Sequence, residues 1–150
     1  SSRRGRGRIV SLRGFSTINY WADDVAAAVA WYTEFLEVQP YFERQGPDGR
    51  PAYAEFRIGD YQAELGIVDR RYAPPGAANE PGGAVMYWHV DDLEATVERL
   101  LLMGAAEYQA ITSRGEAGFV TAAVLDPFGN VLGVMYNPHY VDVLRSTKQA

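Results

Sequence analysis

Hydrophobic and polar residues alternate along eight short stretches of the chain, and along two others hydrophobic residues recur every three to four positions. Alternation is typical of a strand with one buried face, and the longer period is typical of an amphipathic helix. The helical stretches begin after Asp24 and Asp92, a residue type suited to an N-cap. Strands are predicted over residues 15–22, 38–44, 51–58, 61–68, 84–90, 105–111, 119–125 and 131–136.

The predicted order of elements, βαβββ, occurs twice, and short motifs repeat with it. Residues 19–25 read Asn-Tyr-Trp-Ala-Asp-Asp-Val and residues 87–93 read Tyr-Trp-His-Val-Asp-Asp-Leu. In each, an aromatic strand end runs into two aspartates and an aliphatic residue. Gly104 is placed to end the second helix as its C′ residue. The segment 126–130, Asp-Pro-Phe-Gly-Asn, suits a type I turn before the last strand.

These motifs divide the chain into two similar modules. Module one covers 15–68 and module two 84–137, joined by a linker over 69–83 that is rich in proline and glycine. A basic N-terminal tail over 1–14 precedes the domain, and a C-terminal tail over 138–150 follows it.

Charge and composition exclude several classes of protein. The net charge is −5, but five arginines fall in the first thirteen residues, so the rest of the chain carries 9 basic and 19 acidic side chains. An acidic body argues against nucleic acid and against an anionic membrane as partners. The absence of cysteine excludes a disulfide scaffold, a thiolate metal site and a cysteine nucleophile. No apolar run reaches the length of a membrane span, so we expect a cytoplasmic protein.

The tandem pattern resembles the vicinal oxygen chelate superfamily of glyoxalases, bleomycin-resistance proteins and extradiol dioxygenases. The resemblance covers residues 15–137. It is carried by Val90-Asp91-Asp92-Leu93 before a helix, the exit at Gly104-Ala105, and Asp126-Pro127-Phe128-Gly129-Asn130 before the last strand. It implies an α+β fold in which tandem βαβββ modules form a curled mixed sheet around a cup, with the helices outside, and it implies a homodimer.

Enzymes of this superfamily hold a divalent metal with side chains from the first and last strands of each module. The resemblance places these four positions at Thr17, Glu64, Val85 and Gly133. Among them only Glu64 is a competent ligand, whereas a stable metal site usually has at least three protein ligands. We therefore expect no metal and no other cofactor.

Alternation along the strands predicts which side chains face the cup, because residues two apart share a face. Gln62 and Val131 fall on this face, and the opposite face, which includes Ile18 and Tyr20, is expected to pack against the helices. The remaining cup-facing residues form the predicted ligand site: Thr17, Asn19, Trp21, Glu64, Val85, Tyr87, His89, Gly133 and Met135. No catalytic residue is assigned.

Several of these residues have a structural alternative. Glu64 faces either a ligand or an arginine across the sheet. His89 suits a histidine at the surface or one bonded to a carbonyl better than a proton shuttle, and Trp21 and Tyr87 bind a ligand only if the cup is open. His139 is expected to help dock the C-terminal tail.

Three functions are compatible with this pattern. The first, which we favour, is a metal-free protein that binds a small molecule, sequestering an aromatic or antibiotic-like compound. The second is a lyase, isomerase or dioxygenase whose metal is held by displaced ligands such as Glu64 and His89. The third is a metal-free enzyme in which Glu64 acts as a base beside a carbonyl.

Overall fold

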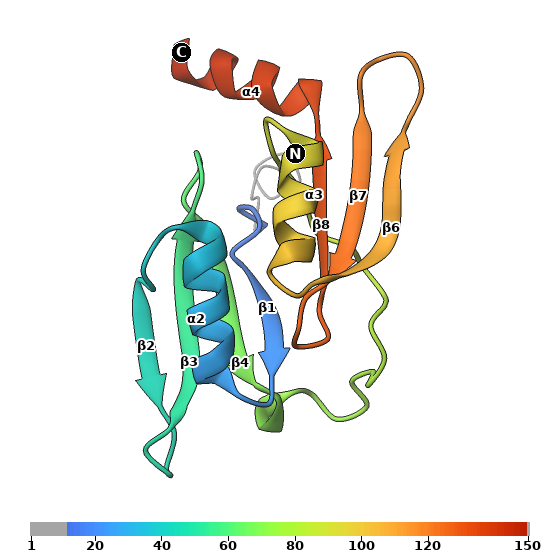
Figure 1. Cartoon of the computed structure of the whole chain (residues 1–150). Coiled ribbons are helices and arrows are strands. Elements are labelled where there is room, and N and C mark those ends of the chain that lie inside the picture. The colour runs from blue at the N-terminus through green and yellow to red at the C-terminus, as the bar shows by residue number, and fades with distance from the viewer. Residues whose placement is uncertain (1–11, 150) are drawn as a thin grey trace, which may run out of the picture.

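A computed structural model describes residues 12–149 of the chain. Most of the predicted basic tail, residues 1–11, lies outside the described residues. Figure 1 shows two modules side by side, with one helix over each sheet and a long connection between the modules. Among residues 12–149, no helix is long and apolar enough to cross a membrane.

The first module is a mixed four-stranded sheet covered by one helix. Its strands lie in the order β1-β4-β3-β2, with β1 parallel to β4 and the other neighbours antiparallel. A 3₁₀ helix, η1 (Arg70–Tyr72), follows the last strand. The elements are β1 (Thr17–Ala22), α2 (Val25–Leu36), β2 (Phe42–Gln45), β3 (Pro51–Ile58) and β4 (Ala63–Asp69).

The second module repeats this arrangement in the order β5-β8-β7-β6, with β5 parallel to β8. A further helix follows its last strand. The two mixed sheets with helices on their outer faces confirm the predicted α+β class and the tandem βαβββ order. The elements are β5 (Tyr87–His89), α3 (Leu93–Leu102), β6 (Ala106–Ser113), β7 (Val120–Leu125), β8 (Val131–Tyr136) and α4 (Pro138–Gln149).

Two strands, β2 and β5, are much shorter than predicted, and the C-terminal segment is helical. β2 starts at Phe42 because Glu37 takes a left-handed conformation (φ 59°) and Pro40 has no N–H to donate. β5 is confined to three residues, and the segment before it contains a turn at Gly83 (φ 80°). Residues 138–149 form α4, which crosses the end of the second sheet toward the first module (Figure 1).

Both module helices start on the predicted aspartates. Asp24 accepts a hydrogen bond from the Ala27 N–H, and Asp92 accepts one from the Ala95 N–H, each at 3.0 Å. These caps satisfy backbone donors that a helix start otherwise leaves unpaired. The helices then bury one apolar side against their sheets, through Val25, Ala28, Tyr32, Leu93 and Leu100.

The helices also join the two modules into one core. The Trp31 indole N–H of α2 donates to the Met103 carbonyl after α3 at 2.7 Å. In the opposite direction, the Arg99 guanidinium of α3 donates to the carbonyls of Glu34 and Phe35 at the end of α2. A cation at this end of a helix is favourable because the last carbonyls are unpaired and carry partial negative charge.

Asp126, in the turn between β7 and β8, connects the two modules. Its side chain is buried, and it accepts hydrogen bonds from the Tyr32 hydroxyl at 2.5 Å and from the Phe128 and Asn130 amides. Asn130 then pairs with both the N–H and the carbonyl of Trp21 in β1. The predicted turn 126–130 therefore fixes the end of β1 as well as the start of β8.

Two buried and two half-buried tyrosines make stability depend on pH at the alkaline end. Burial raises the pKa of Tyr53 and of Tyr140 to about 12, and it raises the pKa values of Tyr20 and Tyr32 further, with the Asp126 charge adding to the effect. In the unfolded chain these phenols lose their protons near pH 10. The folded state holds the protons more tightly, so its advantage is complete below pH 10 and is lost as pH rises through the folded pKa values.

We therefore expect the urea midpoint to stay constant from about pH 8 to 9.5 and to fall above about pH 10. Absorbance at 295 nm should show several of the ten tyrosines ionising only together with unfolding. Tyr32→Phe should make the fall less steep. A single titration of all ten near pH 10 with no loss of stability would contradict this.

Candidate functional site

The two modules leave a pocket of about 1090 Å³ between them, here called the intermodule pocket. Strand β1 lines one side and β5 the other, and each is the edge strand of its sheet. Residues 77–82 of the linker, the turn at Gly129 and Tyr140 of α4 complete the lining. A volume of this order is sufficient for a drug-sized molecule.

Most of the predicted site residues meet in this pocket. Eight of the nine line it: Thr17, Asn19, Trp21, Glu64, Val85, Tyr87, His89 and Met135. The ninth, Gly133, lies beneath a ring of the same site. Ile18 also lines the pocket and is 37% exposed, so it does not pack against the helices as predicted. Gln62 bonds to the Gly59 carbonyl in the turn before β4 and is exposed.

The Tyr87 ring covers Gly133 across the β5–β8 pair. A Cβ at Gly133 would lie 2.7 Å from the Met86 carbonyl oxygen and 2.8 Å from the Tyr87 ring, which is closer than real contacts allow. The Tyr87 hydroxyl donates to Gln109 Oε1 of β6 at 3.0 Å, and this bond fixes the ring across the sheet. Glycine at this position therefore lets Tyr87 lie flat where a larger side chain would project.

A second glycine has the same effect in the first module. Asn19 stands opposite Gly66 in the β1–β4 register, and a Cβ on Gly66 would collide with Asn19 Oδ1. The Asn19 amide therefore lies across β4, on the cup face that Thr17 and Glu64 share. The alternation along β1 predicted this face correctly.

Glu64 lies on the cup face and is paired at the same time. Its Oε1 is 3.0 Å from Arg57 Nη2, and the same nitrogen is 2.9 Å from Glu55 Oε2. The Glu64 side chain is 15% exposed. The guanidinium occupies Oε1, so this oxygen is not free to take a proton from a ligand as a general base would. The carboxylate is suited to holding charge at the pocket wall.

The pocket carries more negative than positive charge. Asp60, Glu64 and Glu80 line it together with one guanidinium, that of Arg70. Arg70 is engaged by Asp23 and by the Phe128 carbonyl, each at 3.0 Å, and Glu64 is likewise engaged by Arg57, so the excess negative charge is that of Asp60 and Glu80. A cationic or donor-rich ligand is therefore electrostatically favoured over an anion.

The side chains around the pocket do not fit a divalent metal. Within residues 12–149, no three His, Asp or Glu side chains come close enough together to hold one. Of the four positions at which the resemblance places metal ligands, Thr17 and Val85 supply no imidazole or carboxylate, and Gly133 lies under the Tyr87 ring. Glu64 is committed to Arg57.

His89 is buried at the end of the pocket nearest α4, and its side chain is 7% exposed. Its Nδ1 accepts a hydrogen bond from the Asn137 N–H at 3.0 Å, so the neutral ring carries its proton on Nε2. Among the described residues, Nε2 has no hydrogen-bond partner, and the nearest acid is Asp91 at 3.6 Å. The structural alternative weighed for His89, a surface residue or a bond to a carbonyl, is wrong.

Sequence reasoning missed Tyr140 and Asp60, which line the same end of the pocket. His139, expected to dock the C-terminal tail, is exposed and lies beside Phe119, whereas Tyr140 makes the docking contacts. One signal was available: asparagine followed by proline at 137–138 is a common helix start. Asn137 Oδ1 indeed accepts from the Tyr140 N–H.

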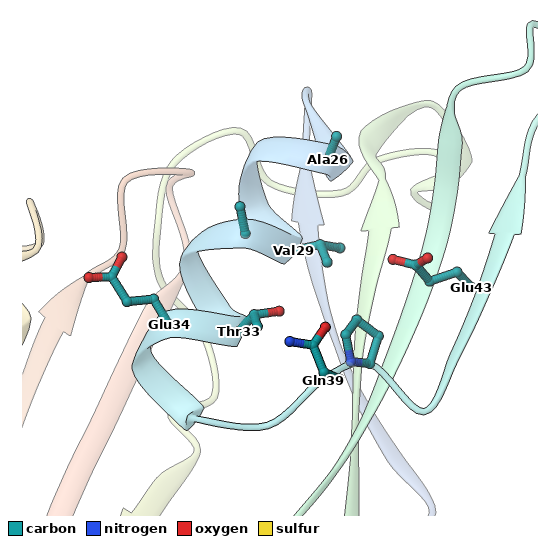
Figure 2. Close-up of a pocket in the computed structure, with 8 residues that line it drawn as sticks. Ala26, Val29, Thr33, Glu34, Gln39 and Glu43 are labelled. Atoms are coloured by element: carbon teal, nitrogen blue, oxygen red, sulfur yellow. The ribbon is translucent and has the colours of Figure 1, made fainter.

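A second, smaller pocket of about 560 Å³ lies between the outer side of α2 and β2 (Figure 2). Figure 2 shows Val29 and Thr33 of α2 facing Gln39 and Glu43 across the groove. It contains none of the predicted site residues. Its lining shows no convergence of polar groups on one point, so it is the weaker candidate.

Comparison with known proteins identifies the family. The family model described as Glyoxalase/Bleomycin resistance protein/Dioxygenase superfamily matches residues 14–134. No curated protein matches the sequence significantly.

Solved structures with the same fold include a glyoxalase-related enzyme from Fulvimarina pelagi (18% identity, TM-score 0.66, covering 85% of this chain and 90% of that one). A glyoxalase/bleomycin resistance protein from Catenulispora acidiphila is 22% identical, with a TM-score of 0.57 and coverage of 83% and 100%. TioX from Micromonospora sp. ML1 is 16% identical, with a TM-score of 0.59 and coverage of 82% and 98%. At these identities the likeness is one of fold.

Proposed function

The chain belongs to the Glyoxalase/Bleomycin resistance protein/Dioxygenase superfamily, and we propose that it is a metal-free member that binds a planar small molecule in the intermodule pocket. One observation carries the proposal: Trp21 from the first module and Tyr87 from the second line the same open pocket, together with the carboxylate of Glu64. Two rings offer stacking surfaces, and the acid favours a cation or a hydrogen-bond donor. The natural ligand in this proposal is an aromatic or antibiotic-like compound that the protein sequesters.

The direct experiment is a calorimetric titration with two probes of the same shape. 9-Aminoacridine is a planar cation with amino donors, and acridone is its neutral counterpart. We expect 9-aminoacridine to bind more tightly than acridone and to raise the melting temperature with concentration. No heat from either probe would contradict the proposal, and tighter binding of acridone would contradict the role of the acid.

A second experiment separates this proposal from a metal enzyme. Elemental analysis of protein purified without chelator should find less than about one zinc, manganese, nickel or iron ion per ten chains, and a chelator should leave the melting temperature unchanged. The physical reason is that the pocket supplies no set of three ligands. Near-stoichiometric metal together with chelator-sensitive stability would favour the lyase, isomerase or dioxygenase alternative.

We also propose that the protein is a homodimer. Within residues 12–149, β2 and β6 are the outer edge strands of their sheets and pair with no further strand, and Phe42 of β2 (42%) and Tyr108 of β6 (47%) are exposed. Open edges of this kind favour a partner, and twofold dimers are the commonest homo-oligomers. Light scattering should give twice the chain mass of 16.6 kDa. A single-chain mass over a wide concentration range would refute this proposal.

We also propose a cytoplasmic location, which cell fractionation would test.

A further inference from the structure

The ring of Tyr140 occupies a slot at one end of the intermodule pocket. It stacks on His89 with 4.8 Å between ring centroids and an interplanar angle of 14°. The Tyr61 ring meets it edge-on at 5.6 Å and 88°. Its hydroxyl donates to Asp60 Oδ2 at 2.9 Å. The slot therefore provides a flat face, a perpendicular wall and a charged acceptor for one aromatic ring with a hydroxyl.

The slot belongs to the pocket and not to the core of either module. Asp60, Tyr61 and His89 all line the intermodule pocket, as does Tyr140. Asp60 and Tyr61 come from the turn before β4 in the first module, and His89 comes from β5 in the second. The four residues meet where the two modules face each other.

Tyr140 also helps to hold α4 in place. The helix starts on Asn137, whose N–H donates to His89 Nδ1 and whose Oδ1 accepts from the Tyr140 N–H. Beyond Tyr140, Val141 and Leu144 are half-buried, and Asp142, Val143 and Arg145 are exposed. None of the side chains of residues 138–147 is fully buried, so α4 can open without disrupting either sheet.

We infer that the slot formed by Asp60, Tyr61 and His89 is a subsite for a phenol-like ring, and that Tyr140 fills it as an internal substitute whose displacement releases α4. This rests on the proposed function only in assigning the slot to the same ligand pocket. The ligand class is an aromatic ring bearing a hydroxyl or amino donor, because the Asp60 carboxylate can only accept.

The geometry predicts how the slot selects a ring. His89 Nδ1 is already used by Asn137, so the imidazole offers its face and not its acceptor. Toluene and anisole could stack there but have no proton for Asp60. Burial and the hydrogen bond to Asp60 raise the pKa of Tyr140 to about 12. The same two features would favour phenol over toluene and anisole in the slot.

Removal of the Tyr140 ring should open the slot, because a tethered ring competes at high effective concentration. The experiment titrates full-length wild type and Tyr140→Ala with phenol, anisole and toluene, followed by amide chemical shifts in two-dimensional NMR. We expect Tyr140→Ala to bind phenol at least about tenfold more tightly than wild type does. The same variant should bind phenol about tenfold more tightly than anisole. Adding Asp60→Ala should abolish the preference for phenol. His139→Ala, on the exposed side of the same turn, should behave like wild type.

Equal affinity of Tyr140→Ala for phenol and anisole, or no gain over wild type, would overturn the inference. A measurement on wild type covers the case in which this variant does not fold. Saturating phenol should accelerate amide hydrogen exchange in α4 several-fold while leaving α3 unchanged, and anisole should not. Unchanged or slower exchange in α4 would overturn the inference as well.

These readouts are independent of the acridine probes. Displacement of Tyr140 by phenol in a protein that binds no 9-aminoacridine would refute the proposed function alone. Binding of 9-aminoacridine without any effect of phenol on α4 would refute the slot alone.

Discussion

Asp126→Ala is expected to lower the free energy of unfolding by about 3–5 kcal/mol, the largest stability effect we predict for a polar residue. Asp126 is only 4% exposed. Its side chain accepts hydrogen bonds from the Tyr32 hydroxyl, from two backbone amides and from the Asn130 side-chain amide. Alanine would leave these donors unpaired in the core. It would also free Asn130, whose bonds to Trp21 tie the turn to β1.

Urea unfolding of the variants measures this effect. Asp126→Asn should cost less, because its amide oxygen still accepts from the backbone. Glu98→Ala on the exposed side of α3 is the control and should change stability by less than about 0.5 kcal/mol. A loss below about 1 kcal/mol in Asp126→Ala would show that the hydrogen-bond cluster does not hold the modules together.

Trp21→Ala is expected to weaken the binding of 9-aminoacridine by about ten- to thirtyfold, because it removes a stacking ring and the apolar area around it. The backbone of residue 21 keeps its two bonds to Asn130, so the fold should persist. Tyr72→Ala removes an exposed ring from η1, outside the pocket, and is the matched control. A loss in Tyr72→Ala as large as that in Trp21→Ala would contradict the site.

Glu64→Gln should weaken the cation about fivefold and acridone by less than about twofold. Its control is Glu55→Gln. Glu55 binds the same Arg57 nitrogen and is 13% exposed, against 15% for Glu64, but it does not line the pocket. Each variant removes one of the two carboxylate charges that pair with Arg57. A difference in ligand binding between them therefore reports on the ligand contact and not on the ion pair. Equal effects would assign Glu64 a structural role.

The fold was predictable because its signals are local and occur twice. The N-caps at Asp24 and Asp92, and the turn over 126–130, are set by residue type and spacing alone. Alternation along β1 and β4 also placed Thr17, Asn19 and Glu64 on one face. What local patterns cannot supply is the register between β3 and β4, which sets Arg57 opposite Glu64 and so decides that the acid is paired.

The candidate site was predictable in part for the same reason. Side chains that alternate on β1 and β5 were assigned to one pocket, and they line it, but so do the intervening residues Ile18, Tyr20, Met86 and Trp88, which were assigned to the helix side. Tyr140 meets Asp60 across 80 residues of chain, through a helix that the sequence pattern did not indicate. Gly133 was assigned by position along β8, but whether it is open depends on how Tyr87 lies across the sheet. Both are consequences of tertiary packing.

The three tryptophans of the chain provide the most direct test of ligand binding between the modules. Trp21 and Trp88 line the intermodule pocket, whereas Trp31, on α2, lies outside it and its indole donates to the Met103 carbonyl. In ¹⁵N-labelled protein, each indole N–H gives its own NMR signal. Saturation with 9-aminoacridine should shift the signals of Trp21 and Trp88 and leave that of Trp31 in place. If no indole signal moved, or if Trp31 moved as far as the other two, binding in this pocket would be contradicted.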